Sequence, residues 1–253
     1  MDIRTTKAKK QLGQNFLKNP KVLQDIATAA ELQKDDYVLE IGPGTGNLTK
    51  QLHKSEIQYL GLEMDASLKS FLGDFNVQYT DALRFDTREL PENYKLVANI
   101  PYYITSPILQ HYLMQPTIHK TPKPEFLLIM VQKEFAEKIC NPEKTSYLQT
   151  SLRTVCNPEY LFTVYAQDFY PVPKVDSAVI KLRCHQDFPT EIDLKKFLKF
   201  LKVCYSKPRK KLRNNLKPFH ELDLDKLPTE IIQERPEDLQ LSDLLELFKK
   251  INN

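Results

Sequence analysis

The sequence holds only six glycines, and three of them fall within residues 42–46. This Gly-Pro-Gly-Thr-Gly run follows an apolar segment at residues 37–41 that is typical of a buried strand, and it precedes helix-like residues. A glycine-rich turn between a strand and a helix lies at the carboxyl edge of a parallel sheet, where such sheets bind ligands. We therefore expect a ligand site at this turn, because glycines let the backbone approach closely and helix N-terminal amides favour a phosphate or a carboxylate.

The periodicity of the chain predicts an α/β fold. Strand-like segments alternate with helix-like segments through about residue 185, and strands separated by helices imply a mainly parallel sheet with right-handed crossovers. We expect about seven strands. The candidates are residues 37–41, 58–64, 77–80, 96–100, 126–131, 161–166 and 177–184.

A second, helical domain is expected at the C-terminus. Polar residues and a proline interrupt the apolar alternation at residues 185–191. Beyond them, leucines and phenylalanines recur at helical spacing over residues 194–203 and again over 239–248. The sequence therefore predicts a sheet domain at residues 1–186 and a small helical domain at residues 187–253.

Basic residues are concentrated at two places, although the formal net charge is only +3. Residues 206–217 carry six basic residues and no acid, namely Lys207, Arg209, Lys210, Lys211, Arg213 and Lys217. Residues 1–21 carry Arg4, Lys7, Lys9, Lys10, Lys18 and Lys21 against Asp2, so the rest of the chain is acidic. Such concentration suits a polyanion, because each phosphate contact releases condensed counterions. The alternative is that both segments form ordinary solvated faces.

Two acids follow the glycine run at the ends of the next two predicted strands. Glu40 precedes the run, Glu63 ends the second strand and Asp81 follows the third. The spacing G-x-G-x-G differs from the G-x-G-x-x-G of dinucleotide folds and resembles the E-x-G-x-G-x-G motif of S-adenosylmethionine-dependent methyltransferases. A carboxylate in the position of Glu63 can accept both ribose hydroxyl protons. A dinucleotide enzyme and a purely structural turn remain the alternatives, and an isolated Asp81 is more often a helix cap.

The fourth predicted strand runs into Asn99, Ile100, Pro101 and Tyr102, a pattern suited to methylation of an aromatic amine. The Asn99 side-chain oxygen and the Ile100 carbonyl can accept from the two N–H bonds of an adenine N6 and stabilise the charge that develops on nitrogen. Pro101 fixes the turn, and Tyr102 offers a ring for an extruded base. Phe169, in a stiff proline-rich stretch, is the candidate for the opposite face of that base. A plain loop with a capping Asn and a core Phe is the alternative.

With these stretches in place, the chain resembles the ribosomal RNA adenine N6-dimethyltransferases, specifically the small-subunit, KsgA-type family. The resemblance covers nearly the whole chain in order. It is carried by residues 12–17, 40–46, Glu63, Asp81, 99–102, 169–177, 206–216 and 235–239.

The resemblance implies a Rossmann-like methyltransferase sheet at residues 1–186 that binds S-adenosylmethionine, followed by an RNA-binding helical domain at residues 187–253. It implies that Asn15 and Leu17 border the cofactor, that Gly42 and Gly44 approach it, that Glu63 and Asp81 bind its ribose and adenine, and that Asn99 contacts both cofactor and target amine. The implied product is dimethyladenine at two adjacent adenines near the 3′ end of 16S rRNA, made during small-subunit assembly. The basic residues Lys207, Arg209, Lys210, Lys211 and Arg213 are the expected RNA contacts.

Two other functions stay open. The macrolide-resistance methyltransferases of the large subunit share the catalytic core, and the chain could instead act mainly as a non-catalytic RNA-binding assembly factor. In the family's basic stretch two adjacent basic residues typically precede the lysine, whereas this chain has Lys207-Pro208-Arg209, with Pro208 as a predicted helix start.

Several classes of protein are not expected. The four cysteines have no C-x-x-C or zinc-ligand spacing, so we expect buried thiols and no metal site. The longest apolar run, residues 126–131, is far shorter than the ~20 residues of a transmembrane helix. The basic N-terminus lacks the apolar stretch of a secretory signal. We therefore expect a cytoplasmic monomer with no membrane partner.

Overall fold

The computed structural model describes residues 8–9, 12–141, 143, 145–185, 192–217 and 224–252. Within these residues the chain forms two compact units. The first unit runs to residue 137 and resumes over residues 158–184, and the second comprises residues 138–157 and the described residues from 185 onward. The sequence-based boundary at 186/187 falls among residues outside the described part, and the grouping of residues 138–157 with the C-terminal helices was not predicted from the sequence.

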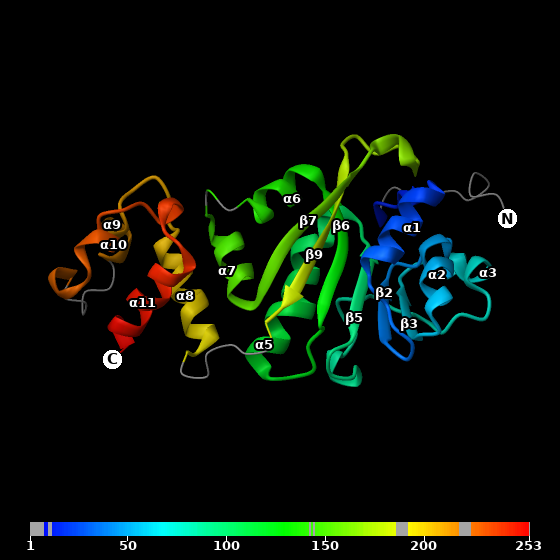
Figure 1. Cartoon of the computed structure of the whole chain (residues 1–253), viewed down its shortest axis with the longest axis horizontal. Helices are drawn as coiled ribbons and strands as arrows, with labels where there is room; N and C mark the ends of the chain where they lie inside the picture. Colours follow the sequence, from blue (N-terminus) through cyan, green and yellow to red (C-terminus); the bar gives the residue numbers. More distant parts are fainter. Residues whose placement is uncertain are drawn as a thin grey trace. The chain divides into compact units, whose positions relative to one another are not determined.

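The first unit is built on a seven-stranded sheet (Figure 1), as the periodicity predicted. Five neighbouring strands are parallel, and β9 pairs antiparallel with β6, so the predicted parallel arrangement does not extend to that edge. In spatial order the strands are β4 (Val77–Tyr79), β3 (Gln58–Glu63), β2 (Tyr37–Ile41), β5 (Lys95–Asn99), β6 (Phe126–Gln132), β9 (Ser177–Cys184) and β7 (Cys156–Val164).

Helices cover this sheet because successive side chains of each strand face opposite sides and both sides are apolar. One core cluster joins Val38, Val97 and Leu128 of the sheet to apolar residues of the two helices nearest the N-terminus. The helices of this part of the chain are α1 (Pro20–Ala29), α2 (Asn47–Leu52), α3 (Lys69–Leu72), α4 (Thr105–Leu109), α5 (Gln115–His119) and α6 (Lys133–Cys140). Short helical turns lie at His53–Ser55, Ala66–Leu68, Thr87–Glu89, Tyr102–Ile104, Gln110–Met114 and Ala166–Asp168.

Helix α1 was not predicted from the sequence. The Asn19 side chain caps it by accepting from the amides of Lys21 and Val22, and Pro20 occupies the first turn, where a missing N–H costs nothing. Its residues Leu23 and Ile26 are buried and pack in the same core cluster as the sheet. The helix therefore covers the sheet directly after the segment that resembles the family's N-terminal motif.

A second, two-stranded sheet brings together motifs that are 150 residues apart. Strand β1 (Phe16–Leu17) pairs antiparallel with β8 (Phe169–Tyr170), with Leu17 opposite Phe169. The Lys18 amide donates to the Asp168 carbonyl at 2.9 Å, and the Asn19 amide group donates to the Asp168 carboxylate at 2.8 Å. The N-terminal motif is therefore held beside the aromatic stretch.

The second unit is helical. Phe197, Phe200 and Phe248 form an aromatic cluster with ring centroids 5.1–6.1 Å apart, inside a core of leucine and isoleucine residues. The Tyr205 hydroxyl lies 2.7 Å from the Thr145 hydroxyl and 2.8 Å from that of Thr150, which ties residues 145–150 to this core. The helices are α7 (Tyr147–Val155), α8 (Leu194–Cys204), α9 (Leu212–Leu216), α10 (Thr229–Ile232) and α11 (Leu241–Asn252), with helical turns at Leu224–Lys226 and Pro236–Asp238.

The described residues also bear on the predictions about membrane-spanning helices and about the burial of the cysteines. None of the helices described here is long and apolar enough to cross a membrane. Of the four cysteines, Cys156 and Cys204 are buried, and Cys140 and Cys184 are half-buried.

Candidate active site

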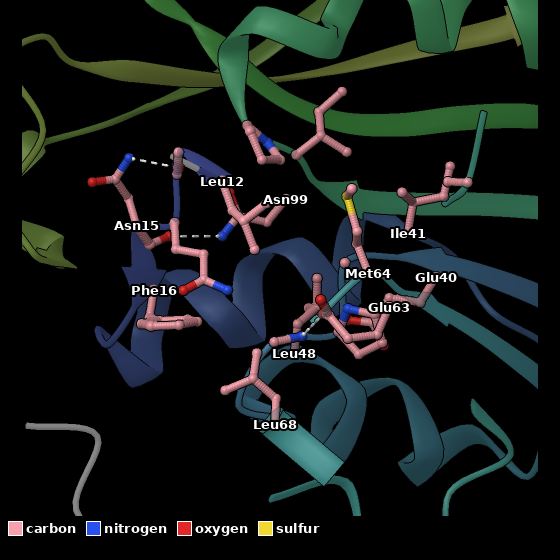
Figure 2. A pocket seen from close by; sticks show the side chains of 18 of the residues that line it. Leu12, Asn15, Phe16, Glu40, Ile41, Leu48, Glu63, Met64, Leu68 and Asn99 are labelled. Atoms are coloured by element: carbon pink, nitrogen blue, oxygen red, sulfur yellow. Dashed lines mark hydrogen bonds between the residues drawn. The ribbon is translucent and has the colours of Figure 1, made fainter. Parts of the chain in front are cut away.

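The predicted site residues of the first unit meet in one pocket at the carboxyl ends of β2, β3, β4 and β5. Its lining includes every residue that the sequence assigned to catalysis or cofactor binding, and Figure 2 shows several of them around the same space. These residues are Asn15, Leu17, Gly42, Gly44, Glu63, Asp81, Asn99, Ile100, Pro101, Tyr102 and Phe169. The structure brings these residues together around one pocket, and their individual roles stay predictions.

The glycine run forms the floor of the pocket. Gly42, Gly44 and Gly46 all have positive φ, from 61° to 73°, which L-residues with a side chain rarely adopt. At Gly44 a Cβ would also lie 3.3 Å from the Phe16 ring, so the backbone there is packed against the N-terminal motif. The Gly46 amide closes the turn onto the Pro43 carbonyl at 2.9 Å, and α2 begins directly after it.

Glu63 is a buried carboxylate at the end of β3, held by two backbone amides. The Gly44 amide donates to one carboxylate oxygen at 2.9 Å and the Asp65 amide to the other at 2.8 Å. Burial raises the pKa of Glu63, and the two amides act against that rise. A carboxylate fixed in this way keeps acceptor capacity, because each of its oxygens has two lone pairs. Glu63 can therefore accept hydroxyl protons from a ligand in the pocket.

Asp81 caps a turn and also lines the pocket. Its carboxylate accepts from the Leu83 amide at 2.9 Å, which is the local cap expected of an isolated Asp after a strand. The same residue lines the pocket together with Thr80 and Ala82. Capping therefore holds Asp81 at the sheet edge without removing it from the site.

Glu40 lies beneath the glycine run and is almost completely buried. The Thr49 hydroxyl donates to one of its carboxylate oxygens at 2.7 Å, and the Tyr59 hydroxyl donates to the same oxygen at 2.6 Å. Burial raises the pKa of Glu40 to about 7, even though both hydroxyl donors act in the opposite direction, and the nearby Glu63 adds to the rise. This carboxyl therefore changes charge within the range of ordinary assays.

Replacing Glu40 by Gln is expected to flatten the pH dependence of stability. A carboxyl with a pKa raised from 4.5 to about 7 binds a proton in the folded chain that the unfolded chain has lost, so the free energy of unfolding falls as pH rises through this window. The contribution is roughly 3 kcal/mol across the window. Urea unfolding at pH 5 and pH 8 measures it. The same decrease in Glu40→Gln as in the wild type would contradict the assignment.

Asn99 ends β5, and the structure orients its amide. The Asn99 side-chain nitrogen Nδ2 donates to the Asn15 carbonyl at 3.5 Å (Figure 2). The side-chain oxygen of Asn99 is therefore directed away from that carbonyl. Ile100 is buried and Pro101 starts a tight helical turn, because the Ile104 amide donates to the Pro101 carbonyl at 3.1 Å. The backbone that follows the strand therefore forms an ordered turn.

The two aromatic residues of the proposed clamp are held differently. The Tyr102 hydroxyl lies 2.7 Å from the Ser177 hydroxyl at the start of β9, and burial raises its pKa. Phe169 lines the pocket but is only 1% exposed, because β1 covers it through Leu17 and it belongs to the sheet core. A base could reach the Phe169 ring only from within the pocket.

Sequence reasoning missed several pocket residues. Gln14, Met64, Leu68 and Tyr103 line the pocket, and Asp65, which follows Met64, contacts the N-terminal segment. Met64 and Tyr103 have side chains that are more than half exposed. Gln14 stands inside the motif that carried the resemblance, but the other three lining residues have no spacing that distinguishes them from core or loop residues.

The basic residues of the second unit lie on a turn that precedes α9. Lys207, Arg209, Lys210 and Lys211 are exposed, while Arg213 is half-buried and pairs with Asp225 at 2.8 Å. The predicted helix start at Pro208 is wrong: residues 206–210 are turns and bends, and α9 begins at Leu212. The buried Asn215 side chain donates to the Cys204 and Lys207 carbonyls and holds the two ends of this loop.

Two further predictions, on the N-terminal basic residues and on the absence of a metal site, concern the described residues only in part. Of the N-terminal basic residues, Arg4, Lys7 and Lys10 lie outside the described residues. Among the residues that are described, no group of three or more His, Cys, Asp or Glu side chains could hold a metal ion.

Comparisons with known proteins place this site in a family. The sequence matches the family described as "Ribosomal RNA adenine dimethylase" over residues 5–253. It is 38% identical to a "Ribosomal RNA small subunit methyltransferase A" of Clostridium botulinum, over 90% of this chain and 86% of that protein, and 35% identical to the protein of the same name from Thermotoga maritima, over 96% and 85%.

Two solved structures have a fold similar to that of this chain. A dimethyladenosine transferase from Plasmodium falciparum matches with a TM-score of 0.79 and 26% identity, covering 94% of this chain and 97% of that one. The 23S rRNA methyltransferase ErmE matches with a TM-score of 0.74 and 27% identity, covering 94% and 100%. The family match and the identity to its relatives both extend over most of the chain, so this protein belongs to the ribosomal RNA adenine dimethylases and is a methyltransferase with a Rossmann-like fold.

Proposed function

We propose that this protein uses S-adenosylmethionine to dimethylate the N6 amines of two adjacent adenines near the 3′ end of 16S rRNA while the small subunit assembles. The observation that carries the proposal is the pocket itself, in which the glycine run, two acids and the Asn99–Tyr102 turn line one space. The relatives named small-subunit methyltransferases support the choice of rRNA.

The residues present fit a nucleoside-containing sulfonium donor. Glu63 offers a fixed carboxylate for ribose hydroxyls, Asp81 an acceptor for an exocyclic amine, and the glycine run a surface that admits close approach. When bound, S-adenosylmethionine supplies an electrophilic methyl group. Asn15 and Leu17 border the same pocket and would enclose the donor from the N-terminal side.

The chain's own contribution to the reaction is to hold and polarise the target amine. The Asn99 side-chain oxygen and the Ile100 carbonyl would accept from the two N6–H bonds, which stabilises positive charge as it develops on nitrogen. Tyr102 and Phe169 would stack on the extruded base. No strong base is needed, because the methylated amine can lose its proton to water.

The second unit would bind the rRNA. Its exposed basic turn carries Lys207, Arg209, Lys210 and Lys211 close together in sequence and beside the start of α9. Phosphate contacts by such residues give affinity without reading the base sequence. The monomeric state and the cytoplasmic location stay predictions.

A second candidate function is methylation of large-subunit rRNA, which is suggested, more weakly, by the structural match to the 23S rRNA methyltransferase ErmE. Primer extension on purified small-subunit particles and on protein-free 23S rRNA separates the two. We expect stops at two adjacent adenines near the 3′ end of 16S rRNA and none in 23S rRNA. Stops in 23S rRNA alone would overturn the choice.

An assembly factor without methyltransferase activity, the third function left open by the sequence, is not supported by the family match. Calorimetry with S-adenosylmethionine distinguishes it, because such a factor has no need of the donor. We expect saturable binding at one site per chain, and no detectable heat would favour the factor.

A further inference from the structure

The N-terminal segment, defined as Lys9 and residues 12–17, is fastened to the loop that follows β3. Residues 12–17 all line the pocket, so this segment forms one of its walls. The segment is closed on itself, because the Lys9 amide donates to the Gln14 side chain at 2.8 Å and the Leu12 amide donates to the Lys9 carbonyl at 3.0 Å. These two bonds connect Lys9 to Leu12 and Gln14 in the wall of the pocket.

The N-terminal segment is held in place by hydrogen bonds to the carboxylate of Asp65. The Lys9 ammonium donates to one of its oxygens at 2.6 Å, and the Gln14 side-chain amide donates to the other at 2.9 Å. The Ser67 amide and hydroxyl donate to the first oxygen as well, at 3.1 and 2.6 Å. Asp65 is 4% exposed, and although burial alone would raise its pKa, these donors hold the pKa well below its usual range.

The same residue also acts on Glu63. Its backbone amide donates to a Glu63 carboxylate oxygen at 2.8 Å, while the Gly44 amide holds the other oxygen. Asp65 is thus bonded through its side chain to the wall of the pocket and through its backbone to the acid on the floor. A ligand that contacts both Glu63 and the N-terminal segment would therefore contact two groups that Asp65 holds in position.

We propose that Asp65 is a positioning residue for the cofactor, which holds the N-terminal segment closed over the pocket through Lys9 and Gln14 while it aligns Glu63. This inference rests on the proposed function, and it adds that the Lys9–Asp65 ion pair strengthens cofactor binding without touching the cofactor. The physical reason is preorganisation: a wall already held in its bound position loses less conformational entropy when the ligand arrives.

The ion pair has the features that make such a contact effective. Its carboxylate is shielded from water, with the Asp65 side chain 3% and the Lys9 side chain 41% exposed, so solvent screens it less than a surface pair. The chain offers a matched surface pair for comparison, because Lys21 and Asp25 on α1 are also 2.6 Å apart but remain exposed. Such exposed pairs have little effect.

The test is a double-mutant cycle in the full-length protein with Lys9→Met, Asp65→Asn and the double variant. Asparagine is chosen because it can still cap the turn at Ser67. The dissociation constant of S-adenosylmethionine is measured by calorimetry for each, with Lys21→Met as the control. We expect each single variant to bind about tenfold more weakly, the double variant to bind no more weakly than Asp65→Asn, and the control to match the wild type.

Steady-state kinetics supply a readout that a general loss of stability would not give. In Lys9→Met the KM for S-adenosylmethionine is expected to rise about tenfold while kcat on small-subunit particles stays near the wild-type value. Unchanged affinity in Lys9→Met, or losses that simply add in the double variant, would overturn the positioning role alone. If the wild-type protein binds no S-adenosylmethionine, the proposed function falls and this inference falls with it.

Discussion

Asn99→Ala is expected to lower kcat for methyl transfer by about 10²- to 10³-fold, because it would remove the acceptor that we propose for the target amine. The Asn99 amide is anchored through Nδ2 to the Asn15 carbonyl, so its oxygen is already oriented before substrate binds. Such a preorganised acceptor acts mainly on the charge that develops during transfer. Single-turnover transfer of labelled methyl groups to small-subunit particles measures the loss.

Tyr102→Phe is the matched control for this variant. It keeps the ring that would stack on the base and loses only the hydroxyl bond to Ser177, so we expect a decrease of less than about tenfold. Wild-type rates in Asn99→Ala would contradict the role of Asn99. Equal losses in both variants would indicate that the turn as a whole, and not the acceptor, is what matters.

Replacing Arg209, Lys210 and Lys211 together by Gln is expected to weaken binding to rRNA on the order of 10²-fold at moderate salt. All three side chains are exposed on the turn before α9. Each lost phosphate contact lowers the slope of log K against log[salt] by a little under one, so the slope should fall by up to about three. Filter binding across a salt series gives both quantities.

The control for charge alone is the triple variant Lys195→Gln, Lys199→Gln and Lys202→Gln on α8. These lysines are also exposed and belong to the same unit, and the change in net charge is identical. The account requires this control to keep the wild-type slope within about one unit. An unchanged slope in the first triple variant would remove those side chains from the interface.

Periodicity was sufficient to predict the sheet. Each of the seven strands overlaps a predicted segment, and the central ones were predictable because strands buried on both faces are near-continuous in Val, Ile, Leu and Phe. Strand β7 was placed too late: it begins at Cys156, five residues before the predicted start at residue 161, and most of its residues are only half-buried or exposed. The antiparallel direction of β9 was not predictable, since an apolar run carries no direction. The β1–β8 pair was missed because it depends on contact between residues 16–17 and 169–170, and helix α1 was missed although it is ten residues long.

The site was predictable only where a motif had a chemical reason. The glycine run, Glu63, Asp81 and the Asn99–Tyr102 turn were found because parallel strands end at one edge, so residues that follow them must meet. Asp65 follows Glu63 by two residues and has no such signal: its role depends on Lys9 and Gln14, which approach it only through the fold. The burial of Glu40 by Tyr59 and Thr49 is likewise a tertiary effect.

The most direct measurement is a crystal structure of the protein with S-adenosylhomocysteine and an adenosine bound together. The account predicts the ribose hydroxyls within hydrogen-bond distance of Glu63, the cofactor adenine beside Asp81, and the adenosine N6 between the Asn99 side-chain oxygen and the Ile100 carbonyl. A cofactor bound away from the glycine run, or an N6 that faces away from Asn99, would contradict it.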